Sequence, residues 1–219
     1  MTDMELLNWA RGPVLEWATI IFVVGVLVRF LEMALMGRKP DLSEPRGNAT
    51  TAGWRTVWHR SIPAPGIARQ APVVVYAGYA FHIGFLVALL FFAPHILLFK
   101  DVLGLSWPAL PFFVVDAATV IAMVALLVLL VHRLANPVRR FLSTWMDYLV
   151  WTVTFLPLLT GYLAFHRMLL PYTEMLAYHV LSVALLMVVF PFTNLMHTFT
   201  LFVSRWYNGA VSGRKGVQL

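Results

Sequence analysis

The 219-residue sequence contains no cysteine, and this absence excludes several kinds of chemistry at once. Without thiolates the chain offers no ligands for an iron–sulfur cluster, no CxxCH motif for covalent attachment of a c-type haem, and no disulfide bonds. Any iron–sulfur chemistry connected with this protein must therefore reside in a partner.

Charged residues are also scarce, since they make up 12% of the chain against 60% hydrophobic residues. A typical soluble domain has about 25% charged residues, and the mean hydropathy of this chain is +0.78. The composition thus indicates an integral membrane protein. The net charge of +6 comes from basic residues between the apolar runs and not from one amphipathic face, so nucleic-acid binding is not indicated.

Five apolar segments are long enough to cross a bilayer, whose hydrocarbon core needs about 20 helical residues. The breaks between them carry charge, and most carry proline or glycine. We therefore predict one all-α membrane domain over residues 1–219, a five-transmembrane-helix bundle. The predicted spans are residues 13–36, 72–99, 110–134, 147–165 and 175–203, and the long polar segment 37–71 is predicted to be a loop.

The first span has two further features. Residues 1–11 lack the basic region of a secretory signal, so we expect this span to be retained. Arg29 and Glu32, three residues apart, would share one helix face, and such a pair in a span faces the bundle or reaches to the interface. A role in holding a haem propionate or a partner is the alternative interpretation.

Lysine and arginine are distributed unevenly among the connections. Six lie in residues 37–71, three in the 133–140 connection and three in the C-terminal tail, against three on the opposite side. Because cytoplasmic loops carry the excess of basic residues, the N-terminus is predicted outside and the C-terminus and the 37–71 loop in the cytoplasm. This orientation requires an odd number of spans, which five satisfies.

Four histidines lie within the predicted spans. His179 and His197 are eighteen residues apart, which on an unbroken helix is about five turns and about 27 Å, so both would share one face near opposite edges of the membrane. The second span contains His82 and His95. Since this span runs outward and the fifth inward, His82 is expected at the depth of His197, and His95 at the depth of His179.

Two matched levels of histidine predict two haem sites. A b-type haem with two axial imidazoles needs one histidine from each of two facing helices, and ionisable residues within spans are functional candidates by default. We predict that His82 and His197 bind an inner haem iron and that His95 and His179 bind an outer one. Gly84 is expected to give the macrocycle room beside the backbone.

The outer level leaves a choice of ligand. Thirteen residues separate His82 from His95, which on a regular helix places His95 about 140° away from the face of His82. Pro94 would resolve this by kinking the helix or by ending it, so that His95 swings round. The alternative outer ligand is His166, at the outer end of the fourth span.

These residues resemble a known family. The segment HVLSVALLMVVFPFTNLMH at 179–197 is similar to the last transmembrane segment of the gamma subunit of respiratory nitrate reductase, a dihaem cytochrome b of five spans. FHIG at 81–84 resembles that family's second span, and ANPVRR at 135–140 resembles its basic loop. That family spaces the two histidines of its second span more closely, and Phe92 stands where a direct alignment places the second ligand. The same cytochrome type also serves complexes related to heterodisulfide reductase and hydrogenases.

The resemblance implies an electron-transfer subunit of a larger oxidoreductase in a prokaryotic cytoplasmic membrane, with two haem b bound by the four histidines. Bis-histidine iron has no open axial position, so it carries electrons. Quinol would be oxidised near the outer haem, and electrons would pass to a cytoplasmic iron–sulfur subunit and through it to a catalytic subunit. The reverse direction would use the same residues. Besides membrane lipid, quinone is thus an expected partner, bound by Lys100, Arg167 and Tyr172.

Two other classes of function are weighed against the cytochrome. A proton-coupled small transporter would use the histidines with Asp116 or Asp147 as a proton relay, although no repeat or pair of broken helices indicates a transporter. A cofactor-free membrane anchor or assembly factor would need none of these side chains. The transporter would keep its activity without haem, and the anchor would tolerate alanine at all four histidines.

Overall fold

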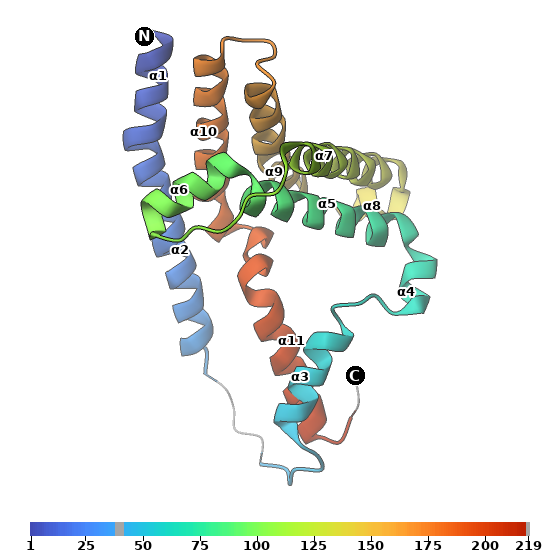
Figure 1. Ribbon diagram of the computed structural model, residues 1–219. Helices are drawn as coiled ribbons and strands as arrows, with labels where there is room; N and C mark the ends of the chain where they lie inside the picture. The colour runs from blue at the N-terminus through green and yellow to red at the C-terminus, as the bar shows by residue number, and fades with distance from the viewer. Residues whose placement is uncertain (38–41, 218–219) are drawn as a thin grey trace.

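The computed structural model describes residues 1–37 and 42–217 of the chain (Figure 1). The regular structure of these residues is helical throughout, without a strand, which confirms the all-α prediction. Arg38 and Lys39, two of the basic residues counted in the predicted cytoplasmic loop, lie outside the described residues.

Five helical stretches of the described chain are long and apolar enough to cross a membrane, which places the protein in the predicted multi-pass class. The first runs from Asp3 to Leu35 and is kinked at Gly12, within the π-helical turn that contains Pro13. The orientation in the membrane stays a prediction. The stretches are α1 (Asp3–Trp9) with η1 (Ala10–Val14) and α2 (Leu15–Leu35), α5 (Pro72–Phe91), α7 (Phe112–Ala135), α9 (Trp145–Phe165), and α10 (Tyr172–Val189) with η2 (Phe190–Phe192).

The segment predicted as a loop at 37–71 contains two helices. Asn48 caps the first of them by accepting a hydrogen bond from the Thr51 backbone N–H at 3.0 Å. Shorter elements elsewhere complete the fold. These shorter elements are α3 (Ala49–His59), α4 (Pro65–Gln70), α6 (Ala93–Leu103), α8 (Pro137–Leu142), η3 (Asn194–Met196) and α11 (His197–Arg214).

The α3 and α11 helices pack along each other because α11 presents glycine where they meet. A Cβ at Gly209 would collide with the Thr56 side chain, and one at Gly213 would collide with Ala52. Two glycines four residues apart let helix backbones approach closely. The GxxxG spacing of Gly209 and Gly213 is a sequence signal for close helix packing. The prediction of a loop at 37–71 did not take this signal into account.

The fifth predicted span is not one helix, so the prediction of an unbroken helix over 175–203 is wrong. α10 ends at Val189, two 3₁₀ turns follow, and α11 begins at His197. Pro191 has no N–H to donate and its ring crowds the carbonyl four residues earlier, which explains a break at this point. Thr193 is fully extended, with φ −129° and ψ 178°. The argument that placed His179 and His197 on one helix face therefore does not apply.

The second predicted span is broken as well, in the way that Pro94 predicted. α5 ends at Phe91, Phe92 is extended with φ −78° and ψ 126°, and α6 begins at Ala93 with Pro94 in its first turn. Proline is well tolerated at that position because the first N–H groups of a helix have no partner within it. The break releases His95 from the helical register of His82.

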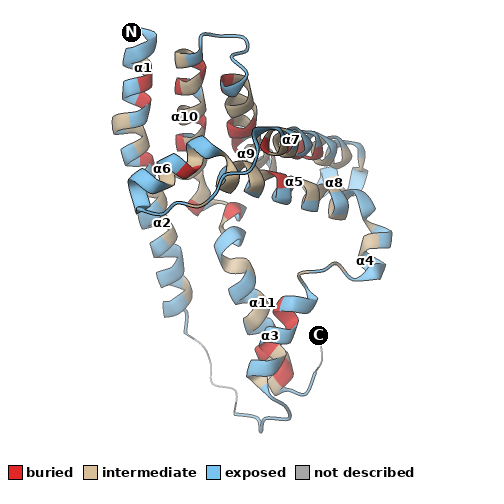
Figure 2. Cartoon of the chain, in the orientation of Figure 1, coloured by how far each residue is buried: buried red, intermediate tan, exposed pale blue. Residues whose placement is uncertain are grey.

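The long helices form packed groups. α5 packs along α7, while α10 packs against α9, α2 and α1. Figure 1 shows α5 and α7 running across the direction of α9 and α10, so a bundle with all five spans along one axis stays a prediction. The start of α1 and the end of α11 lie at opposite ends of the molecule. Buried residues gather where helices meet, and the outward faces are exposed and largely apolar (Figure 2).

Gly84 is buried between α5 and α7. A Cβ on this residue would collide with the Ala118 carbonyl oxygen and approach the Ala122 Cβ to 3.0 Å. The expectation that Gly84 makes room for a macrocycle is therefore replaced by a packing role: the missing side chain lets α5 approach α7.

Replacing Gly84 with alanine is expected to lower the free energy of unfolding by about 1–3 kcal/mol, the usual cost of overpacking. Gly78 on the same helix is a matched control, because no atom lies within 4 Å of a Cβ built there. Gly78→Ala should be neutral or slightly stabilising, since alanine is the better helix former. Thermal unfolding in detergent, followed by circular dichroism, measures both variants, and equal effects would contradict the packing role.

Candidate functional site

The structure places the predicted inner pair of histidines side by side. His82 comes from the middle of α5 and His197 is the first residue of α11, and their ring centroids are 6.1 Å apart with the ring planes at 79°. His82 Nδ1 lies 2.6 Å from the Gly78 carbonyl oxygen, and His197 Nδ1 lies 2.6 Å from that of Asn194. Both side chains are on exposed residues, so each ring is held by a local backbone bond and its far edge stays accessible.

The predicted outer pair also meets. The planes of the His95 and His179 rings are nearly parallel, at 18°, and the ring centroids are 6.2 Å apart. The break before α6 brings His95 Nδ1 to 2.9 Å from the carbonyl oxygen of Ala88. His179 Nδ1 lies 3.3 Å from Thr160 Oγ1, and Thr160 donates its own proton to the Leu156 carbonyl oxygen at 2.7 Å. Both histidines are half-buried.

The Nδ1 contacts determine which nitrogen of each neutral ring is free. A carbonyl oxygen can only accept, so Nδ1 carries the proton in His82, His95 and His197, and the lone pair is on Nε2. Thr160 accepts at the fourth ring once its own proton is donated. A histidine that binds a metal almost always donates its other N–H to such an acceptor, which orients the ring and raises its basicity. All four rings are thus prepared to bind through Nε2.

The spacing of the rings fits one iron between each pair. An imidazole nitrogen binds a transition metal at about 2 Å and the ring centre lies about 1 Å behind it, so rings on opposite sides of one iron have centroids about 6 Å apart. The observed separations are 6.1 and 6.2 Å. Each pair would supply two protein ligands, the number of axial positions that a haem leaves to the protein.

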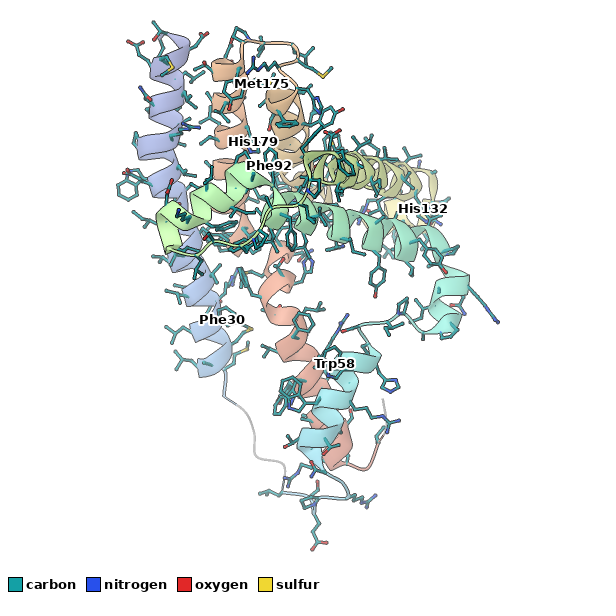
Figure 3. The ribbon with its side chains drawn as sticks, viewed as in Figure 1. Phe30, Trp58, Phe92, His132, Met175 and His179 are labelled. Atoms are coloured by element: carbon teal, nitrogen blue, oxygen red, sulfur yellow. The ribbon has the colours of Figure 1, made fainter. Side chains whose placement is uncertain are left out.

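Neighbouring helices shape the space around the outer pair. A Cβ at Gly161 on α9 would lie 3.0 Å from the His179 Cε1, so this glycine lets the imidazole lie against α9. Phe92, in the break before α6, meets the His95 ring edge-on with centroids 5.2 Å apart. Figure 3 shows Phe92 and His179 on neighbouring elements, with the histidine on α10. A direct alignment would make Phe92 a ligand, but in the structure Phe92 packs against the predicted ligand His95.

Comparison with known proteins adds one relative. No family model and no solved structure matches the chain. A protein of Nitratidesulfovibrio vulgaris Hildenborough, described only as "Protein", is 30% identical over 203 residues, which cover 89% of this chain and 88% of the relative. The chain belongs to the family of this relative. Since the match spans nearly all of both chains, the family likeness extends over the helices and their connections alike.

The relative's description states no activity, so within this family the function has to be argued from the site. The resemblance to the nitrate reductase gamma subunit stays a prediction.

His166, the alternative outer ligand, lies in a different environment in this family member. Its Nε2 is 2.6 Å from Asp116 Oδ1, which ties the end of α9 to the start of α7. Its ring contacts are with Tyr162 and Phe165, at centroid distances of 4.4 and 5.2 Å. The Nε2 atom of His166 is therefore hydrogen-bonded to the Asp116 carboxylate and does not face a second imidazole. Sequence reasoning missed this pair, although both residues lie near the predicted outer ends of their spans.

The three residues predicted to bind quinone are only partly brought together. The Arg167 guanidinium carbon lies 5.8 Å from the centre of the Tyr172 ring, in the connection from α9 to α10. Arg167 and Leu169 both have positive φ, at 53° and 67°, so this connection turns sharply. Lys100 lies on α6, and no contact among the described residues joins it to the other two.

Both acids considered for a proton relay are ion-paired at helix ends. Asp116 bonds His166 as described, and Asp147 Oδ1 lies 3.0 Å from Arg133 Nη1. Asp147 also accepts the Thr144 backbone N–H at 2.8 Å, which caps α9. Asp147 therefore has a structural explanation in helix capping and in the link between α7 and α9.

Proposed function

We propose that this chain is a membrane-anchoring dihaem cytochrome b subunit that passes electrons between the quinone pool and a cytoplasmic iron–sulfur partner. The observation that supports this most is the pair of cross-helix imidazole contacts. Each joins two separate helices, each has the centroid spacing of axial ligands to one iron, and each ring has its Nδ1 hydrogen-bonded. A single buried histidine would be weak support, but two matched pairs are not expected by chance.

His82 and His197 are the proposed ligands of the inner haem iron, and His95 and His179 those of the outer one. When bound, haem b supplies one-electron oxidation and reduction at an iron without an open axial position. The backbone carbonyls of Gly78, Ala88 and Asn194 would hold three of the rings, and the Thr160 hydroxyl the fourth, so that each ring presents Nε2 to the iron.

Quinone is proposed as the membrane substrate, with Arg167, Tyr172 and Lys100 as its contacts. Support for the first two is their mutual contact in the α9–α10 connection, at the end of α10 nearer His179. Oxidation of a quinol also needs a proton acceptor. His166 bonds Asp116 through Nε2, which leaves its Nδ1 to take the quinol proton. A series of edge-to-face contacts through Phe165 and Phe92 connects the His166 ring to His95.

The proposed partner is a cytoplasmic iron–sulfur subunit, connected to a catalytic subunit, in a prokaryotic cytoplasmic membrane. The absence of cysteine assigns iron–sulfur clusters to another chain. The basic residues of the 37–71 and 133–140 segments support an acidic docking surface on that chain, since opposite charges speed association. The α3 helix, within the 37–71 segment, pairs with α11 at the end of the molecule opposite the start of α1 (Figure 1).

The haem content of the purified protein tests this function. Protein expressed with adequate haem supply should carry about two haem b per chain by the pyridine haemochrome assay, with a dithionite-reduced spectrum of b type. A single haem would contradict electron transfer between two levels. Absence of haem would overturn the proposal in favour of the transporter or the anchor, both of which function without it.

A further inference from the structure

The break between α10 and α11 leaves the Pro191 backbone carbonyl without its helical partner. In a continuous helix the Pro191 carbonyl oxygen would accept from the N–H of Leu195. Here the Leu195 N–H donates to Thr193 Oγ1, at 3.4 Å. A carbonyl inside a membrane needs another donor, because an unsatisfied polar group there costs several kcal/mol.

Arg29 of the first span supplies that donor. Its Nε donates to the Pro191 carbonyl oxygen at 3.0 Å, across 162 residues of sequence. Its Nη1 meanwhile pairs with Glu32 Oε2 at 2.8 Å, so the guanidinium is oriented by a carboxylate on the same helix. The charged pair noted in the sequence therefore faces the break in α10.

The first span also packs against both sides of the break. A Cβ at Gly25 would lie 2.6 Å from the Pro191 ring, so only glycine lets the proline pack against α2. The Phe22 ring meets Phe190 edge-on at 5.2 Å and lies 6.2 Å from Phe199. Residues before and after His197 are thus both held by α2.

The direction of the His197 ring depends on this break. Its Nδ1 donates to the Asn194 carbonyl oxygen at 2.6 Å, so the ring follows the path of η3. η3 in turn follows the extended Thr193 and the Pro191 turn that Arg29 holds. A chain of backbone contacts therefore runs from Arg29 to the imidazole that faces His82.

We propose that Arg29 is a positioning residue for His197: by bonding the Pro191 carbonyl it keeps the α10–α11 break in the shape that aims His197 at His82. This inference rests on the proposed function where it concerns the inner haem. The arrangement of the two imidazoles can be tested without haem.

The haem test compares Arg29→Ala, Arg29→Lys and Glu32→Gln. The ring planes are at 79° in the inner pair and 18° in the outer pair, and perpendicular axial imidazoles give the more anisotropic ferric low-spin EPR signal, so the two haems are distinguishable. Arg29→Ala should weaken retention of the inner haem about 10-fold and shift its midpoint potential, with the outer haem unchanged. Arg29→Lys can still donate to the carbonyl, so it should retain most of the inner haem. Glu32→Gln should have the smallest effect on inner-haem retention.

The second test measures the positions of the imidazoles directly. Because the chain has no cysteine, Ile83→Cys and Thr198→Cys, next to the two inner histidines and both exposed, give a unique pair of spin labels. Arg29→Ala should broaden or shift the measured distance, and Arg29→Lys should not.

An unchanged distance and an unchanged inner haem would overturn the positioning role, as would equal loss of both haems. A wild-type protein without haem would overturn the proposed function alone, because the label distance still decides the role of Arg29.

Discussion

His197→Ala is expected to halve the haem content, from about two haem b per chain to about one, and to abolish electron transfer to a cytoplasmic acceptor. The remaining His82 would lack its partner imidazole, because among the described residues His197 is the histidine whose ring lies against it, at 6.1 Å. The loss should be confined to the more anisotropic EPR signal. The pyridine haemochrome assay measures the haem content of the purified variant, and EPR shows which of the two haems is lost.

His59→Ala is the matched control for that result. His59 ends α3 and is exposed, and among the described residues no ring contact joins it to either imidazole pair. It should leave two haems in place. If His197→Ala kept both haems, or if the control lost one, the assignment of the inner ligands would be wrong.

His95→Ala is expected to remove the outer haem, whereas His166→Ala is expected to keep both. His95 faces His179 at 6.2 Å with its Nε2 free, while the Nε2 of His166 is bonded to Asp116 at 2.6 Å. His166→Ala should instead slow quinol oxidation, because the proposed proton acceptor is lost, typically by about 10²- to 10⁴-fold in the rate. Haem content and steady-state quinol oxidation, measured on the same preparations, separate the two roles.

The reverse pattern, with haem lost from His166→Ala and kept in His95→Ala, would assign the outer ligand to His166. Loss of haem in both variants would indicate instead that the α7–α9 contact supports the outer site structurally.

The predicted pairs of histidines lie close together, although helix periodicity does not account for it. The eighteen-residue spacing of His179 and His197 assumed an unbroken helix, and Pro191 interrupts it. His82 nonetheless lies beside His197, and His95 beside His179, as the pairing of the second and fifth spans predicted. In the second span, Pro94 predicted the break that lets His95 reach His179.

Glycines were harder to interpret from the sequence. Gly84 lies two residues from His82, which favoured a role beside the cofactor, but its free face lies against α7. Gly25 had no predicted role, but its missing side chain lets the Pro191 ring pack against α2. A glycine in the sequence indicates that another group packs closely against the backbone. Whether that group is a cofactor, a helix or a side chain depends on how the other elements pack.

By itself, the sequence determined the membrane class, the five apolar helices and the lack of iron–sulfur ligands, because composition and the bilayer's thickness decide these. The tertiary structure alone decided that α5 and α7 run across α9 and α10, that Asp116 bonds His166, that a carbonyl or hydroxyl contacts Nδ1 in each of the four paired histidines, and that Arg29 reaches the break at Pro191. These contacts join residues far apart in the chain, and their partners are set by how helices pack, which no local pattern encodes.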